Sequence, residues 1–164
     1  MKTNEILEQL LDILSRETEL YQAMSTVINK EKDAAIQSEL MALNEAEIEK
    51  ENILVALGLL EGQRCNLVTS LADTLGYPAR DMSLTQISQL VGEPFADRLK
   101  QAKSDLSALL ESVQAANQRN KHLFEDSRER SAKKAQAFFA SLSWGSLASS
   151  SFCGTAIPDL GCTL

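Results

Sequence analysis

The sequence contains a single histidine, His122, and this scarcity excludes most metal and acid–base chemistry. No Glu-x-x-His or His-x-x-x-His pair is present, so a di-iron centre of the helical-bundle type is excluded. Gly58 and Gly62 lack the lysine and the preceding strand that a phosphate-binding loop requires. We interpret His122 as an exposed residue on a helix flank, and we predict no enzyme activity, no catalytic residue, no metal site and no cofactor.

Cysteines and aromatic residues are also few. The three cysteines Cys65, Cys153 and Cys162 form no regular spacing, which argues against a disulfide framework. We expect Cys65 to be a small reduced residue in or near the core. Aromatic residues make up 5% of the chain and apolar residues 44%, a mixture that favours helix–helix packing over a β-sandwich.

Long apolar runs are missing as well, since none reaches the about 18 residues that a membrane-spanning helix needs. The opening Met1-Lys2-Thr3-Asn4-Glu5 leads directly into an amphipathic pattern without the apolar region of a signal peptide. A net charge of −7 argues against non-specific nucleic-acid binding. We therefore expect a cytoplasmic protein that neither enters a membrane nor binds nucleic acid.

The most informative absence lies in residues 94–142, which contain no glycine and no proline after Pro94. Such a stretch predicts one helix of roughly 70 Å, at about 1.5 Å per residue. A small enzyme does not need a helix of this length. The pattern instead favours an elongated helical scaffold that holds other proteins.

Two further long helices are predicted, over residues 4–32 and 39–76. Ser38 is a candidate N-cap, Gly76 a stop signal and residues 33–38 a corner. The first helix repeats an apolar residue every seven positions, at Ile6, Ile13, Leu20 and Val27.

Between these helices and the last one, Ser83 and Gln86 have the spacing of a capping box, which predicts a short helix ending near Leu90. The expected fold is therefore all-α: an elongated antiparallel bundle of three long helices with a short connector helix. We assign residues 1–142 to the helical bundle and residues 143–164, rich in serine and glycine, to a flexible tail.

Charge is distributed unevenly along this bundle. Residues 38–76 hold two basic and seven acidic side chains, for a net charge of −5. Residues 94–142 hold nine basic and six acidic side chains, for a net charge of +3. Opposite charge favours packing of the two segments on each other, and a basic partner surface on the last helix is the alternative.

Four polar residues stand where the helical rhythm would place apolar ones: Glu61, Arg64, Asn117 and Asn120. Glu61 and Arg64 are three residues apart and can pair along one helix face. The two asparagines have the same spacing and could satisfy each other or nearby backbone groups. We predict that these residues form a polar seam that fixes helix register. Alternatively, the asparagines mark the point where internal packing ends and a partner surface begins.

Near the end of the last helix, an almost wholly polar run at residues 127–134 precedes the densest apolar and aromatic cluster: Phe138, Phe139, Leu142 and Trp144. We favour a role for this cluster in recognising a client polypeptide, because the polar run separates it from the core rhythm. Packing against the end of the bundle is the alternative. Lys133 and Lys134 would attract an acidic partner.

Three stretches resemble FlgN-type flagellar export chaperones, and the likeness extends from residue 5 to about residue 142. They are the leucine-rich first helix with Glu17 and Glu31, the stretch Glu61-Gly-Gln-Arg64, and the stretch Asn117-Gln-Arg-Asn120-Lys-His-Leu123-Phe124. The resemblance implies a cytoplasmic chaperone that binds the C-terminal segment of hook–filament junction proteins of the FlgK/FlgL type. Such a chaperone prevents premature assembly of its clients and presents them to the export gate.

The resemblance also implies that the late part of the last helix and the following tail form the client-binding surface. The corresponding positions are Leu123, Phe124, Phe138, Phe139, Leu142 and Trp144. Two alternatives stay open. The seven-residue repeat permits a coiled-coil structural protein that self-associates, for example as a homodimer. A chaperone of a non-flagellar type III secretion system would share the same helical design.

Overall fold

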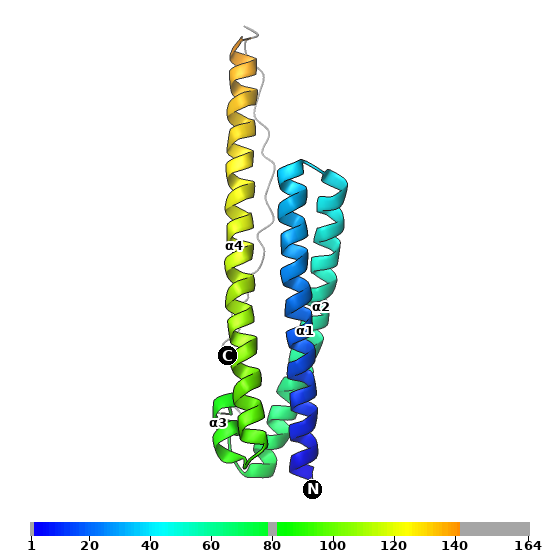
Figure 1. The fold of residues 1–164 in the computed structure, drawn as a ribbon, viewed down its shortest axis with the longest axis vertical. Coiled ribbons are helices and arrows are strands. Elements are labelled where there is room, and N and C mark those ends of the chain that lie inside the picture. The colour runs from blue at the N-terminus through cyan, green and yellow to red at the C-terminus, as the bar shows by residue number, and fades with distance from the viewer. Residues whose placement is uncertain (1, 79–81, 142–164) are drawn as a thin grey trace. The chain divides into compact units, whose positions relative to one another are not determined.

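A computed structural model describes residues 2–78 and 82–141 of the chain, and its regular secondary structure there is wholly helical. The four helices are α1 (Lys2–Gln37), α2 (Leu40–Leu75), α3 (Leu84–Leu90) and α4 (Phe95–Ser141) (Figure 1). The predicted all-α class is confirmed. The chain divides into two units, residues 1–123 and residues 124–164.

The turn between α1 and α2 is shorter than the sequence suggested. α1 continues to Gln37 and does not end near residue 32, because Glu31 and Ala34 are buried and extend its packing face. Ser38 is not the N-cap of α2: it adopts a φ of 61°, and Glu39 occupies the cap position. The Glu39 amide donates to the Ala34 carbonyl over 2.9 Å, which closes the end of α1.

The other predicted helix ends are where the sequence placed them. α2 is capped by Gly76 with a left-handed φ of 72°, and its amide reaches the carbonyls of the last turn. Ser83 and Gln86 form the expected capping box: the Gln86 side chain accepts from the Ser83 amide over 2.8 Å, and Ser83 Oγ accepts from the Gln86 amide.

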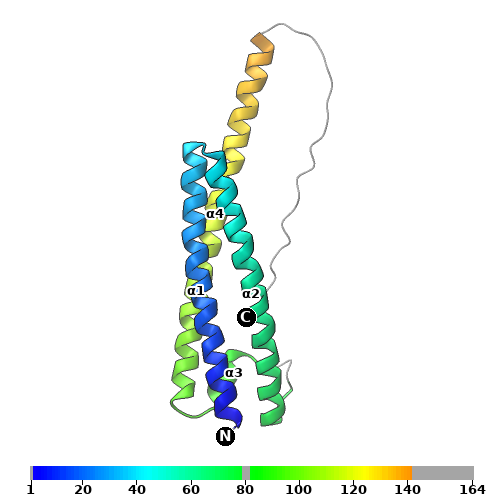
Figure 2. The same cartoon turned by 90° about the vertical axis from the view of Figure 1, so that its right-hand side faces the viewer.

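The directions of the helices follow from their cross-links within residues 1–123. α1 and α2 lie side by side and antiparallel, and they spread apart towards the end where α3 sits (Figure 2). The first half of α4 runs in the same direction as α1, because Arg98 meets Glu8 and Asn120 meets Ile28. α4 is therefore antiparallel to α2.

The core of this unit consists of two apolar clusters. The first joins all four helices: Leu7, Leu10, Leu14, Leu71, Ala72, Met82, Leu84, Ile87, Leu99 and Leu106. The second joins the three long helices: Met24, Val27, Ile28, Ala46, Ile53, Leu57 and Val113. α3 thus closes only the end at which α1 and α2 diverge, since its side chains enter only the first cluster.

Three small residues of α2 lie outside this core, and for Cys65 this is contrary to expectation. Cys65 is exposed and is therefore not a core or boundary residue. Gly58 is also exposed, and no heavy atom lies within 4 Å of the position a Cβ would occupy there. The same holds for Gly62, so neither glycine serves close helix packing within the chain.

We expect Gly58→Ala to raise the free energy of unfolding by about 0.8 kcal/mol, because alanine lowers the entropy of the unfolded chain and meets no obstruction in the helix. Urea unfolding followed by circular dichroism measures this change. Gly76→Ala is the control and should lower the unfolding free energy, since a Cβ is strained at a φ of 72°. Loss of stability in Gly58→Ala would contradict this account of α2.

Candidate functional site

A buried ion pair joins α1 and α2 next to the first apolar cluster. The Glu17 carboxylate accepts from the Arg64 guanidinium over 3.2 Å, and their side chains are 6% and 19% exposed. Glu61 lies on the outer side of the same guanidinium, 3.7 Å from it. Burial raises the pKa of the Glu17 carboxyl, while the charge of Arg64 and its hydrogen bond act in the opposite direction.

A second polar layer lies beyond the second apolar cluster. Lys50 donates to both carboxylate oxygens of Glu31 over 3.2 Å and to the Asn117 side chain over 2.9 Å. The buried Asn120 amide donates to the Ile28 carbonyl over 2.8 Å and to Glu31 over 3.1 Å. Glu31, 5% exposed, therefore receives donors from both α2 and α4.

The two layers repeat at matching intervals. Glu17 and Glu31 stand two heptads apart on α1, and Lys50 and Arg64 stand two heptads apart on α2. Because α1 and α2 are antiparallel, there is only one register in which Glu17 meets Arg64 while Glu31 meets Lys50. A shift of α2 along α1 would leave at least one buried carboxylate without its cation, which is costly.

The structure places the four predicted seam residues in these layers. Arg64 meets Glu61, as their spacing indicated, but its closer partner is Glu17 of α1, which the sequence did not indicate. Asn117 and Asn120 bond different groups and do not bond each other. The central acceptors are Glu17 and Glu31, whose burial the residue pattern alone had not predicted. A signal was present, because both glutamates fall within the 3-4 apolar rhythm of α1.

The expected client-binding residues lie in and after the last part of α4. Leu123 and Phe124 are half-buried. Phe138 and Phe139 belong to α4, but their side chains lie outside the part of the chain that the structure describes. Leu142 and Trp144 lie wholly outside it. Every residue from 125 to 134 is exposed, so this stretch of helix has no buried face of its own.

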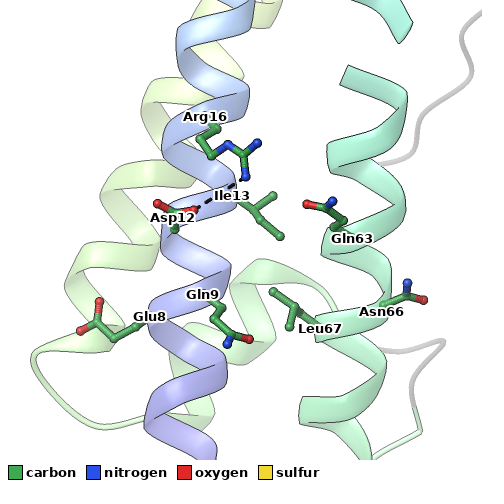
Figure 3. A pocket seen from close by; sticks show the side chains of 8 residues that line it. All are labelled: Glu8, Gln9, Asp12, Ile13, Arg16, Gln63, Asn66 and Leu67. Carbon is green, nitrogen blue, oxygen red and sulfur yellow. Dashed lines mark ion pairs between the residues drawn. The ribbon is translucent and has the colours of Figure 1, made fainter. Parts of the chain in front are cut away.

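An open groove of about 610 Å³ lies between α1 and α2 where the two helices diverge (Figure 3). Ile13 and Leu67 project into it from opposite helices, and Gln63 of α2 lies across from Ile13. Asp12 and Arg16 form a loose pair, 4.0 Å apart, on the α1 side. The apolar floor and polar rim suit an apolar side chain of a partner.

Residues 2–78 and 82–141 contain no group of three or more histidine, cysteine, aspartate or glutamate side chains placed to hold a metal ion. Over the same residues, no helix combines the length and the apolar character needed to cross a membrane. The polar groups that do converge are paired with one another inside the bundle. Their geometry fixes the packing of helices and positions no nucleophile or acid–base pair.

Fold and site together define a helical scaffold with buried ion pairs between α1 and α2 and a long charged last helix. The chain matches the FlgN protein family over residues 1–144, and it belongs to that family. It is therefore a flagellar export chaperone, a class that binds flagellar proteins and is not enzymatic. No curated protein and no solved structure matches the chain.

Replacement of the buried cation at Arg64 tests the first polar layer. We expect Arg64→Met to lower the free energy of unfolding at neutral pH by about 3 kcal/mol, because it leaves the Glu17 carboxylate buried without a partner. A raised folded-state pKa means that the folded protein binds the proton more tightly than the unfolded chain. The contribution of Glu17 to the free energy of unfolding therefore falls as the pH rises from the pKa of Glu17 in the unfolded chain through its higher pKa in the folded protein.

The loss in Arg64→Met should accordingly shrink as the pH is lowered and Glu17 becomes protonated. Urea unfolding across a pH series measures it. The double variant Glu17→Met/Arg64→Met should recover most of the loss, since two apolar side chains replace the pair. An equal loss at every pH, or no recovery in the double variant, would contradict a buried ion pair.

The second polar layer is tested by Asn120→Asp. The new carboxylate faces Glu31 and the Ile28 carbonyl and can donate to neither, so we expect a loss of at least about 2 kcal/mol at neutral pH. Asn117→Ala is the matched control, because that side chain is exposed, and it should change stability by less than about 0.5 kcal/mol. Similar effects of the two substitutions in thermal unfolding would show that Asn120 is not the buried anchor.

Proposed function

We propose that this chain is a cytoplasmic chaperone of flagellar type III export that binds the C-terminal segment of hook–filament junction proteins of the FlgK/FlgL type. It prevents premature assembly of these clients and presents them to the export gate. The proposal rests on membership of the FlgN family over residues 1–144. The residues that we propose to carry client binding are Leu123, Phe124, Phe138, Phe139, Leu142 and Trp144.

The exposed run at residues 125–134 is the observation in α4 that supports this assignment. A helix that is polar on all sides gains no burial from its own chain, and tertiary packing usually supplies most of the stability of a helix. The aromatic residues Phe138 and Phe139 follow this run on the same helix. An apolar client segment laid along this part of α4 would supply the missing contacts.

The chemistry of the run also indicates how the client is attracted and released. Lys133 and Lys134 are exposed, and Lys133 pairs with Glu129 at 3.7 Å, a weak surface contact. A client segment that folds on binding loses conformational entropy, which keeps the affinity moderate. We expect a dissociation constant on the order of micromolar to tens of nanomolar.

The aromatic pair provides the most direct test. Phe138→Ser/Phe139→Ser should weaken binding of the C-terminal segment of a hook–filament junction protein by at least about tenfold, because two large apolar contacts are removed. Isothermal titration calorimetry with the full chain measures this. The double variant Lys133→Glu/Lys134→Glu should weaken binding at low salt and much less at high salt.

Tyr77→Ser serves as a control, since Tyr77 is an exposed aromatic residue outside α4, and it should leave client affinity unchanged. Absence of binding heat and of any shift in gel filtration, across the hook–filament junction proteins of the same organism, would reject the proposed clients. Unchanged affinity in the aromatic double variant would reject the proposed surface.

A further inference from the structure

The outward face of α2 carries a row of large apolar side chains in water. Its members follow one another at helical spacing: Met41, Ile48, Val55 and Leu59. Their exposed fractions run from 52% for Ile48 to 81% for Met41. The buried residues Ile53 and Leu57 fall on the opposite side of the helix, so α2 is apolar on two faces. Several large apolar side chains exposed along one face of a helix mark an interaction surface.

The charged residues of α2 beside this row are acidic. Glu45 lies one turn from both Met41 and Ile48, and Glu51 lies one turn from both Ile48 and Val55. Both glutamates are exposed. The only basic residues of α2 are Lys50 and Arg64, and both turn inward to the buried glutamates of α1. The outward face therefore combines an apolar row with acidic flanks.

The row continues into the groove between α1 and α2. Gln63, one turn beyond Leu59, lines that groove together with Asn66 (Figure 3). Gly62 directly precedes Gln63, and a Cβ at this position would have no heavy atom within 4 Å. A partner backbone can therefore approach α2 closely at the point where the row meets the groove.

We propose that the outward face of α2, from Met41 to Leu59, binds an amphipathic helix of another protein whose apolar stripe is flanked by lysine or arginine. The row extends about 27 Å along the helix axis, which matches a partner helix of about 18 residues. Charge decides between occupants. A second copy of α2 is disfavoured, because it would bring glutamate against glutamate. Residues 143–164 are also disfavoured, because their only charged side chain is the acidic Asp159.

This surface differs from the late α4 residues proposed for the client, so it serves a second partner. The probe for it is a designed three-heptad peptide with leucine on its apolar stripe and lysine at the flanking positions. A twin peptide carries glutamate at those positions. Fluorescence anisotropy with the full chain, at low and at high salt, measures the binding of each peptide.

We expect the lysine peptide to bind and the glutamate twin to bind at least roughly tenfold more weakly at low salt. The double variant Val55→Gln/Leu59→Gln should lower affinity for the lysine peptide by at least roughly tenfold. Glutamine has good helix propensity, so the helix should remain intact. Glu45→Gln/Glu51→Gln should weaken binding at low salt only. Tyr77→Gln is the control and should bind as the unaltered chain does.

Equal affinity for the two peptides, or unchanged binding in Val55→Gln/Leu59→Gln, would overturn the proposal. Light scattering over a dilution series measures the molar mass and tests whether a second copy of the chain occupies this face instead. A dimer that becomes monomeric in Val55→Gln/Leu59→Gln would identify the face as a self-interface and also overturn it. A constant mass in both proteins, with selective binding of the lysine peptide, supports a separate basic partner.

Discussion

Two buried carboxylates on α1 set the constraint on which the rest of the structure depends. Glu17 and Glu31 are each withdrawn from water, and each must meet a cation to remain so. Arg64 and Lys50 meet them because the spacing on α2 equals the spacing on α1. Leucine-rich faces alone permit several registers of similar energy. The paired charges select one, and the position of α4 then follows from the Asn120 contact with Glu31.

This constraint has a consequence for the opposite face of α2. Because both of its basic side chains are engaged with α1, the charge left on its outward face is acidic. The exposed apolar row lies within that acidic face. The residues that determine register on the inside thus also shape which partners the outside accepts, since electrostatic complementarity governs the choice of partner.

α4 divides its length between two kinds of surface. Its first half, through Val113 and Asn120, supplies apolar and polar contacts to the core. From residue 125 to residue 134 every side chain is exposed. Helix propensity and local charge pairs such as Lys133 with Glu129 maintain such a segment, and they do so weakly. A helix of this kind is suited to gain contacts from a bound polypeptide.

Much of the fold followed from local sequence features. The absence of glycine and proline after Pro94 predicted the long last helix, and Gly76 and the Ser83–Gln86 pair marked helix ends correctly. These features act within one or two turns, so they are readable without knowledge of neighbours. The end of α1 was misplaced, because burial of Glu31 and Ala34 against other helices continues the helix beyond its apparent stop.

The sequence by itself determined the helical class, the approximate lengths of the helices and the unusual polar residues in their apolar stripes. Only the tertiary structure decided that Arg64 meets Glu17, that Lys50 and Asn120 converge on Glu31, and that one apolar row of α2 stays in water. The physical reason is that periodicity identifies which faces of a helix are apolar, while the choice of partner for each face depends on contacts between residues distant in the chain.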